Sequence, residues 1–400
     1  MTVVLRDLQT VLRHELGDEV IVDNYSVNSL VPPGENYSST ILSVMCSIKQ
    51  NKNGATETLH LVAKMTPTSN LHRQFFDNCF IFKKEIFFYK EIIPLYKNLE
   101  MEFGVEENSI FDIGPKFYGS RLSSNPKVDF DDDALILLEN LKVRGYYTGE
   151  RKLGLDLDHS RAAIRALAKF HALGVALKCK RPEQFEILKH ESKHHIIKPG
   201  AFQGMKNSLE NALLTDPLIS QYSSKWEPIM KTKPDFSSIP PEPWTTIVHS
   251  DFWLNNVMFH KDQNGKIDEI KFIDFQNYIF QSPINDLIFF ICSSVVTDLI
   301  SKNLESLLDL YYETFVAVLK IMNCDVSHFG RDKFDEKVKN DAKKELKHCV
   351  LFINIQTIDV EKDGVDATDL QSVLEHHIPN ENFFDKMRQI IMLFVERGWI

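Results

Sequence analysis

Two carboxylates and an amide stand in an order that suits phosphoryl transfer. The chain reads H-x-D-x-x-x-x-N from His249 through Asp251 to Asn256, and Asp274 then closes an apolar run. When a phosphoryl group leaves a nucleotide, one carboxylate orients the attacking hydroxyl and accepts its proton, while an amide and a second carboxylate hold magnesium on the phosphates. Asp251 is therefore the candidate base, and Asn256 and Asp274 are candidate catalytic residues that bind magnesium.

The segment between Asn256 and Asp274 predicts how their side chains meet. The apolar residues 257–259 and an expected second strand over residues 267–273 flank the turn-rich residues 260–265, which end in Asn-Gly. Asn-Gly between two apolar runs is a strong hairpin signal, so Asp274 should return beside Asn256. The alternative is a plain surface turn, because such turns favour Asp and Asn in any case.

A lysine and a glutamate upstream follow the order that the same chemistry requires. Lys64 ends an apolar strand, where it could reach nucleotide phosphates, and Glu85 in the next helix could pair with its ammonium. Taken alone, Lys64 is an ordinary strand end and Glu85 an exposed acid worth little energetically. Together with Asp251, Asn256 and Asp274 they make five ordered matches, which favours a phosphotransferase.

A glycine-rich G-x-G-x-x-G loop does not precede Lys64. Residues 33–39, Pro-Gly-Glu-Asn-Tyr-Ser-Ser, stand in its place between the first two expected strands. Gly34, Ser38 and Ser39 could present backbone N–H groups and hydroxyls to phosphate oxygens. The alternative is a β-turn in which Gly34 supplies a positive φ.

Composition limits the class of protein. At 400 residues and 43% hydrophobic content, the chain is long enough for two domains with real cores. A net charge of −10 argues against nucleic-acid binding. The six cysteines include no C-x-x-C pair, which favours free thiols in a reducing compartment.

The sequence shows no expected membrane segment. Residues 1–18 mix charged and apolar positions, which indicates an amphipathic helix and no signal peptide. The most apolar later stretch, residues 287–296, is too short to span a bilayer. We therefore expect a soluble, cytoplasmic protein.

The first third of the chain is rich in strands. Apolar and β-branched runs separated by Pro-Gly and Asn-Gly turns predict an antiparallel meander, followed by a long helix over residues 71–99. The expected strands cover residues 25–31, 40–48, 56–65, 116–118 and 134–139.

After residue 142 the pattern changes to long helices. Apolar residues recur at helical spacing over residues 158–176, 205–231, 285–300, 304–322, 333–355 and 383–397. The expected fold class is α+β and bilobal: a small antiparallel-sheet lobe over residues 1–141 joins a larger, mostly helical lobe over residues 142–400. The catalytic loop 249–256 and the metal-binding strand 267–276 would lie at their junction.

Several histidines invite other assignments. Residues 190–194 match the H-E-x-x-H zinc pattern, but the segment is polar and has no identifiable third ligand, so a solvated helix face is expected. His171 lies on an apolar stripe and is expected to be a buried histidine with hydrogen-bond partners. His249 is expected to anchor the loop by hydrogen bonding, because Asp251 is a closer acceptor for a substrate proton.

Further motifs accompany the catalytic residues: 34–39, 138–141 (Leu-Glu-Asn-Leu), 167–172 (Leu-Ala-Lys-Phe-His-Ala), 253–256 (Trp-Leu-Asn-Asn), 273–276 (Ile-Asp-Phe-Gln) and 396–398 (Glu-Arg-Gly). In these motifs the chain resembles the ecdysteroid kinase-like (CHK kinase-like) family, relatives of choline and aminoglycoside kinases within the protein-kinase-like fold. The resemblance covers nearly the whole chain. Two positions depart from it: the family usually has Gly where Ser250 stands, and often an acidic residue where Asn140 stands.

The resemblance implies ATP and Mg²⁺ as cofactors. It implies that residues 34–39 form the nucleotide loop, with Gly34, Asn36, Ser38 and Ser39 as the residues that bind the nucleotide. It also implies that Lys64 and Glu85 form the lysine–glutamate pair, and that the backbone around Glu139 and Leu141 is the interlobe hinge that holds adenine.

The resemblance further implies a small-molecule kinase whose acceptor is an ecdysteroid or another lipophilic or xenobiotic alcohol. Residues 146–156 and the helices after residue 231 are the expected lining of the acceptor pocket. Two alternatives stay open. One is a choline-type kinase, which needs an anionic or aromatic cage for a quaternary ammonium. The other is a pseudokinase that binds nucleotide or sterol without transfer, although binding alone does not require a general base.

Overall fold

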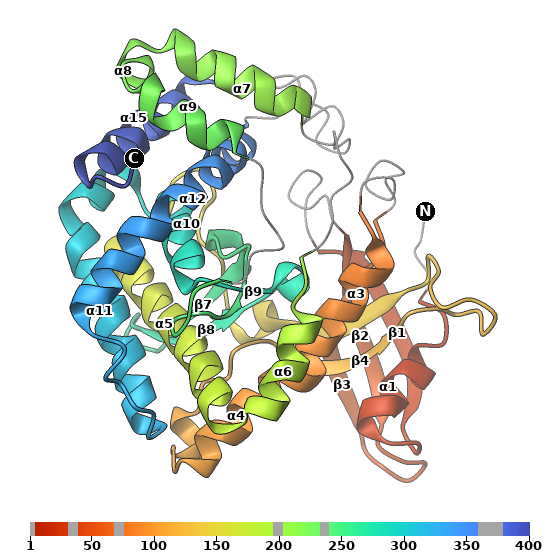
Figure 1. The fold of residues 1–400 in the computed structure, drawn as a ribbon. Coiled ribbons are helices and arrows are strands. Elements are labelled where there is room, and N and C mark those ends of the chain that lie inside the picture. Colours follow the sequence, from red (N-terminus) through yellow and green to blue (C-terminus); the bar gives the residue numbers. More distant parts are fainter. Residues whose placement is uncertain (1–4, 31–38, 68–75, 195–202, 233–239, 359–378) are drawn as a thin grey trace.

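The structure is a computed structural model that describes residues 5–30, 39–67, 76–194, 203–232, 240–358 and 379–400. A β-sheet formed by the first third of the chain stands beside a larger group of helices (Figure 1). The expected α+β fold class, with an antiparallel-sheet part followed by a helical part, is confirmed. The boundary at residue 141 stays a prediction. No helix in the described part of the chain is both long and apolar enough to cross a membrane.

The sheet has five antiparallel strands in the order β1-β2-β3-β5-β4. They are β1 (Ile21–Ser29), β2 (Thr40–Lys49), β3 (Thr56–Met65), β4 (Phe117–Arg121) and β5 (Leu135–Glu139). The antiparallel meander of the first three strands is confirmed. β1 begins earlier than predicted, because Ile21 and Val22 pair with the end of β2 on the far side of a bulge.

The two faces of the sheet belong to two different cores. On one face, alternate residues of β3 and β5 such as Leu61 and Leu137 pack in a core that includes helix α1 (Leu8–Leu16). On the other face, Ile136 and Leu138 pack with residues of the helical part. Since side chains alternate along a strand, Lys64 follows Val62 onto this second face, toward the helices.

The helix predicted over residues 71–99 is observed as α3 (Asn78–Phe87), a π-helical turn η1 (Phe88–Ile92) and α4 (Ile93–Glu102). Residues 76 and 77 are not helical: Asp77 caps α3 by accepting the N–H of Phe80 at 3.0 Å, so the predicted start was too early. Residues 71–75 lie outside the described residues. The π turn precedes Pro94, which lacks an N–H and whose ring displaces the carbonyl four residues earlier.

The rest of the chain is mainly helical and carries two small strand pairs. Strand β6 (Thr246–Val248) pairs with β9 (Ile279–Gln281), and β7 (Val257–Lys261) pairs with β8 (Ile267–Phe272). The helices are α5 (Leu157–Lys180), α6 (Pro182–Glu191), α7 (Gln203–Thr215), α8 (Pro217–Ser220), α9 (Ser223–Lys231), α10 (Pro283–Ser294), α11 (Thr297–Ile321), α12 (Arg331–Thr357) and α15 (Glu381–Glu396).

Two further helix boundaries differ from the prediction. The single helix expected over residues 205–231 is three helices. The first break arises because Asp216 precedes Pro217 and caps the N–H groups of Leu218 and Ile219. The break expected near residue 302 lies instead between α10 and α11. There the backbone of Leu155 bonds to Ser294 at 2.7 Å and to Val296 at 3.0 Å, in place of helical hydrogen bonds.

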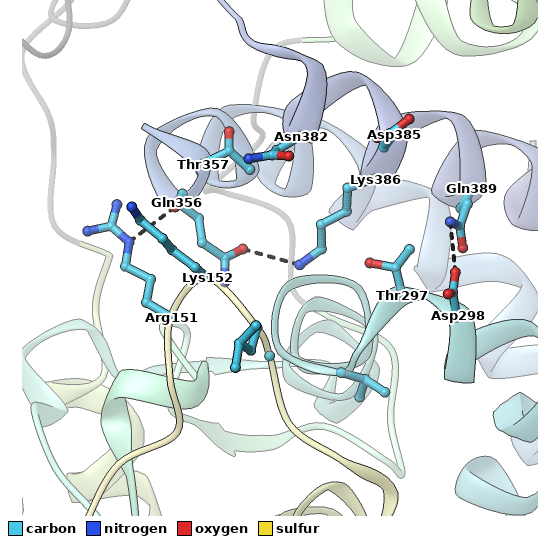
Figure 2. A pocket seen from close by; sticks show the side chains of 13 residues that line it. Arg151, Lys152, Thr297, Asp298, Gln356, Thr357, Asn382, Asp385, Lys386 and Gln389 are labelled. Atoms are coloured by element: carbon cyan, nitrogen blue, oxygen red, sulfur yellow. Dashed lines mark hydrogen bonds between the residues drawn. The ribbon is translucent and has the colours of Figure 1, made fainter. Parts of the chain in front are cut away.

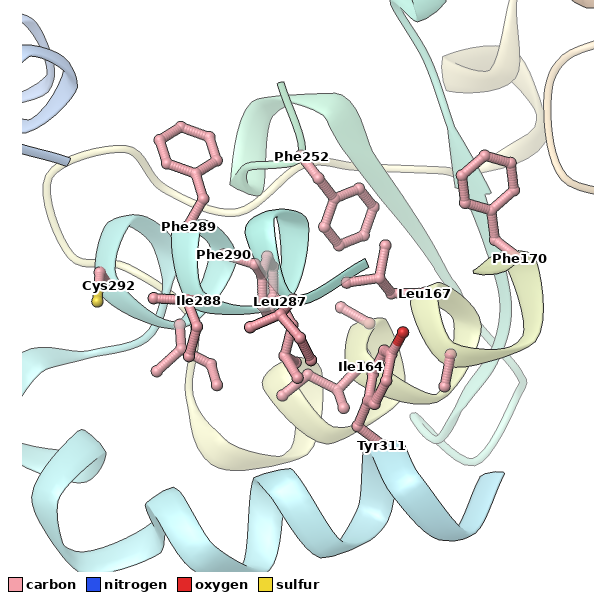
Figure 3. Packing of buried hydrophobic residues seen from close by; sticks show 14 of the residues in the cluster. Ile164, Leu167, Phe170, Phe252, Leu287, Ile288, Phe289, Phe290, Cys292 and Tyr311 are labelled. Atoms are coloured by element: carbon pink, nitrogen blue, oxygen red, sulfur yellow. The ribbon is translucent and has the colours of Figure 1, made fainter. Parts of the chain in front are cut away.

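A dense apolar core supports the loop that follows β6. Phe252 packs against Phe272 with ring centroids 4.7 Å apart and against Phe290 of α10 at 5.2 Å. Figure 3 shows Phe252 above α10, with Leu167 of α5 beside it and Tyr311 of α11 beneath. Because this ring is fully buried, the backbone around Asp251 is held by close packing.

Candidate functional site

The loop after β6 closes on itself through Asn256. The side-chain amide of Asn256 donates to the carbonyl of Asp251 at 2.8 Å and to its carboxylate Oδ2 at 3.2 Å. The loop ends in the 3₁₀ turn η4 (Leu254–Asn256), which leads directly into β7. Since the nitrogen of the amide is used, its oxygen is the atom that can face a metal.

The predicted hairpin between Asn256 and Asp274 is confirmed. Val257 pairs with Phe272, and the N–H of Ile273 donates to the carbonyl of Asn256 at 3.0 Å. Asp274 follows with φ 64°, in the left-handed region that Asp tolerates better than most residues. The hairpin therefore brings Asp274 close to Asn256, because its neighbour Ile273 is bonded to Asn256.

Lys64 joins the sheet to this hairpin. Its ammonium donates to Oε2 of Glu85 at 2.6 Å, to Oδ1 of Asp274 at 2.7 Å and to Oε1 of Gln276 at 3.4 Å. Lys64 and Glu85 are buried, whereas 24% of the Asp274 side chain is exposed. Three candidate residues from β3, α3 and the end of β8, far apart in the chain, thus meet at one point.

The charges of this cluster are strongly coupled. Burial alone would lower the pKa of Lys64, but the carboxylates of Asp274 and Glu85 outweigh it, so the ammonium stays protonated. Burial raises the pKa of Glu85, Lys64 opposes this rise, and the nearby charge of Asp274 adds to it. Two carboxylates share one cation here. The second oxygen of Asp274, Oδ2, accepts a long hydrogen bond from Nε2 of Gln276 at 3.4 Å, and because the side chain is partly exposed, Asp274 can bind a further positive charge.

Asp286 on α10 holds the loop backbone and was missed in the sequence. Its buried carboxylate accepts the N–H of His249 at 2.6 Å and the N–H of Ser250 at 2.8 Å. It also accepts Nε2–H of His171 at 3.2 Å, and the Tyr311 hydroxyl donates to Nδ1 of that ring at 2.7 Å. His171 is therefore a buried, hydrogen-bonded histidine, as expected. A carboxylate inside an apolar helix was the available signal, because it must find buried donors.

His249 anchors the loop, as expected. It is fully buried, and its Nε2–H donates to the carbonyl of Ile273 at 3.0 Å. Burial lowers its pKa, which keeps the ring neutral. The imidazole thus ties the loop of Asp251 to the strand that ends at Asp274.

Ser250 occupies a position where the backbone favours glycine. Its φ is 64°, and its N–H is fixed on Asp286 at 2.8 Å, so the loop holds this conformation despite the β-carbon. The departure from the family pattern therefore falls at a position with real backbone strain.

We expect Ser250→Gly to stabilise the protein slightly. Removal of the β-carbon relieves about 1 kcal/mol of left-handed strain, and the greater freedom of glycine in the unfolded chain offsets part of this gain. The denaturant midpoint should therefore rise a little, and Ser250→Val should lower it. A Ser250→Gly midpoint below that of the wild type would contradict this interpretation of the loop.

Asp251 lies in an environment that suits a base near neutral pH. Burial raises its pKa to about 7, and the nearby charge of Asp274 acts in the same direction. The charge of His348 on α12 and the hydrogen bond from Asn256 oppose this rise. Burial, with the nearby charge of Asp274, is therefore what makes the Asp251 carboxylate more basic than an exposed one.

The expected nucleotide-contacting residues are partly described. Gly34, Asn36 and Ser38 lie outside the described residues, and Ser39 is buried directly before β2. The role of this loop stays a prediction.

The expected hinge residues Glu139 and Leu141 lie in the described part of the chain, and both accept hydrogen bonds from other residues of the protein. The carboxylate of Glu139 accepts from Arg144 at 3.0 Å and from the N–H of Lys116 at 3.3 Å. The carbonyl of Leu141 accepts the N–H of Tyr146 at 3.2 Å. The adenine-binding role of these backbone groups also stays a prediction.

The two histidines of the zinc pattern over residues 190–194 do not share a helix face. Helix α6 ends at Glu191, so His194 does not continue on the helix face of His190. His190 instead contacts Glu191 at 2.9 Å and Lys193 at 3.1 Å. Within the described ranges, the group of three potential ligands that do lie close together is the partly exposed set on the β7–β8 hairpin: His260, Asp268 and Glu269.

A polar cavity of about 350 Å³ lies elsewhere in the helical part (Figure 2). It is lined by residues 151–154 and by side chains from α11, α12 and α15, and none of the candidate catalytic residues borders it. At its wall, Lys386 donates to the carbonyl of Ser293 at 2.6 Å and to Gln356 at 3.3 Å. The cavity is therefore separate from the candidate catalytic residues, although it includes part of the expected acceptor lining.

Lys64 on the sheet pairs with Glu85 of a helix and with Asp274 at the end of the hairpin. This arrangement is typical of a kinase-type phosphotransferase. Comparison with known families identifies the group within that class. The model of the ecdysteroid kinase-like family matches residues 33–324, so the chain belongs to this family. The resemblance noted in the motifs is thereby confirmed.

Comparison with solved structures finds kinases that share little sequence with the chain. A Plasmodium vivax ethanolamine kinase has 11% identity and a TM-score of 0.41, covering 96% of this chain and 85% of its own. An amicoumacin kinase in complex with AMP-PNP, Ca²⁺ and Ami has 11% identity and a TM-score of 0.36, covering 90% and 91%. A choline/ethanolamine kinase family protein from Mesorhizobium loti has 10% identity and a TM-score of 0.32, covering 92% of each chain. A search of curated proteins finds no match.

Proposed function

We propose that this protein transfers the γ-phosphate of ATP to a hydroxyl group of a small, lipophilic alcohol. The observation that carries the proposal is the junction at Lys64, whose ammonium lies 2.6 Å from Glu85 and 2.7 Å from Asp274. Asp251 accepts the proton of the acceptor hydroxyl and orients its oxygen, as in other phosphoryl transfers. Family membership supports the kinase class, and the choice of acceptor is the proposal's own.

The residues present fit a magnesium ion. Magnesium prefers oxygen ligands, and the amide oxygen of Asn256 and the partly exposed carboxylate of Asp274 are such ligands on neighbouring parts of one hairpin. When bound there, Mg²⁺ neutralises charge on the phosphate oxygens. Lys64, oriented by Glu85, supplies a second positive charge for the α- and β-phosphates.

The nucleotide would lie between the sheet and the helical part. In this proposal Gly34, Asn36, Ser38 and Ser39 cover the phosphates with backbone N–H groups and hydroxyls, and the adenine base lies against the backbone of Glu139 and Leu141.

The cysteines offer separate support for a cytoplasmic location, because each of the six thiols is free.

Transfer of labelled γ-phosphate to a panel of acceptors tests the proposal. The panel contains sterols, drug-like alcohols and choline, each with ATP and Mg²⁺. Transfer to the lipophilic alcohols supports the proposal, and transfer to choline alone would favour a choline-type kinase. Tight nucleotide binding without transfer to any acceptor would favour a binding protein of the pseudokinase type.

We expect the rate of transfer to fall at acid pH. Burial raises the pKa of Asp251 to about 7, and a protonated carboxyl cannot accept the proton of the hydroxyl. The rate should therefore drop about tenfold per pH unit on the acid side of this pKa and level off above it. Bound magnesium would shift this fall in rate to lower pH and would not reverse it. A rate profile that rises as the pH falls would contradict the role of Asp251.

A further inference from the structure

Aromatic side chains from three elements meet beside the loop of Asp251. Trp253, two residues after Asp251, contacts Phe352 of α12 edge-on, with ring centroids 4.7 Å apart. Phe352 in turn contacts Phe289 of α10 at 4.9 Å. Trp253 and Phe352 are only partly buried, so this apolar wall keeps exposed surface next to the candidate base.

His348 is fixed on this wall in a single orientation. Its ring is stacked on Phe289, with centroids 4.0 Å apart and planes 7° from parallel. Its Nδ1 donates to the carboxylate of Glu345 at 3.0 Å. His348 lies one helical turn before Phe352, so both side chains project from the same face of α12.

The second nitrogen of His348 is available to a ligand. Stacking and the bond to Glu345 use one ring face and Nδ1, while 40% of the side chain remains exposed. Across the part of the chain that the structure describes, no hydrogen bond to Nε2 is formed. Because the ring of His348 is held in place, its Nε2 is a preorganised hydrogen-bond donor or acceptor.

The surroundings of His348 favour its charged form. Burial by itself would lower its pKa, but the hydrogen bond and charge of Glu345, together with the charges of Asp251 and Asp286, outweigh burial. The pKa is therefore raised, and Nε2 carries a proton that it can donate.

We propose that Trp253, Phe352 and His348 form the acceptor subsite, and that the acceptor is an alcohol on a flat apolar ring system with a second oxygen next to the reacting hydroxyl. The ring lies against the two aromatic side chains, and the second oxygen accepts a hydrogen bond from Nε2–H of His348. A quaternary ammonium is excluded, because its charge would face that of His348.

This assignment of the acceptor subsite rests on the proposed kinase function, but the binding of small alcohols tests it separately from phosphate transfer. The full chain is titrated by calorimetry with 2-hydroxy-1-indanone, with 2-indanol, which lacks the neighbouring oxygen, and with choline. His348→Phe keeps a ring for stacking on Phe289 and removes the donor. His328→Phe makes the same change at an exposed histidine after α11 and serves as control.

The wild type should bind 2-hydroxy-1-indanone about tenfold more tightly than 2-indanol, as one hydrogen bond from a charged donor predicts. His348→Phe should remove this preference and leave 2-indanol binding and ATP binding unchanged, whereas the control keeps the preference. A structural defect would weaken both indane ligands together. Loss of both, an unchanged preference in His348→Phe, or tightest binding of choline would overturn the subsite.

Transfer assays on the same samples keep the two proposals apart. If the binding preference depends on His348 but no phosphate is transferred, the subsite stands and the proposed kinase function fails. If phosphate is transferred at equal rates to both indane alcohols by wild type and His348→Phe, the kinase function stands and the subsite fails.

Discussion

Replacement of Asp286 by alanine is expected to lower the free energy of unfolding by about 3–5 kcal/mol and to abolish phosphate transfer. The carboxylate accepts three buried donors, the N–H groups of His249 and Ser250 and Nε2–H of His171. Alanine leaves all three without an acceptor, and each such buried donor costs about 1–3 kcal/mol. The strained backbone at Ser250 also loses the bond that holds it.

The control for this variant is Asp268→Ala. Asp268 also accepts from a histidine, His260, at 2.7 Å, but the pair is partly exposed and should contribute less than about 1 kcal/mol. Denaturant unfolding gives the comparison. Asp286→Asn keeps one acceptor oxygen and serves as a folded variant for the transfer assay. An Asp286→Ala protein as stable as Asp268→Ala would contradict the assignment of Asp286 as the loop anchor.

Replacement of Lys64 by methionine should destabilise the fold by a similar amount, about 3–5 kcal/mol, and lower phosphate transfer by at least about a hundredfold. The ammonium is the shared partner of Glu85 and Asp274, at 2.6 and 2.7 Å. Without it, a fully buried carboxyl loses its cation and Asp274 loses a positive neighbour. Part of the stability loss is recovered at low pH, where the carboxyls take up protons.

Lys49→Met is the matched control for Lys64→Met. Lys49 pairs with Asp23 at 2.9 Å, and a third of each side chain is exposed, so its loss should cost less than about 1 kcal/mol and leave transfer unchanged. Nucleotide affinity should also fall in Lys64→Met and not in the control. Equal stabilities for the two variants would show that the buried cluster does not hold the two parts of the chain together.

The local patterns were sufficient for the parts of the site that lie close in sequence. The Asn-Gly turn predicted the hairpin, and the hairpin fixes Asn256 beside Ile273 and Asp274. The pairing of Lys64 with Glu85 followed from their order along the chain. The hairpin depends on strand alternation and turn chemistry, which are local, whereas the Lys64–Glu85 pair was predicted from the residue order that phosphoryl transfer requires.

Features that depend on tertiary contacts were not predictable in the same way. The break between α10 and α11 arises because the backbone of Leu155, far away in sequence, takes hydrogen bonds there. Asp286 appeared only as a charge beside an apolar run, since its donors come from another segment. The position of His348 against Phe289 requires the packing of α12 on α10, which no periodicity specifies.

The most direct test of the central claim is the rate of γ-phosphate transfer by Asp251→Asn. The measurement uses saturating ATP, Mg²⁺ and the best acceptor of the panel, with nucleotide affinity measured on the same samples. We predict a rate about 10²–10⁴-fold below that of the wild type, with nucleotide affinity and the denaturant midpoint little changed, because asparagine keeps the shape and loses the base. Transfer undiminished in Asp251→Asn would contradict the assignment of Asp251 as the catalytic base.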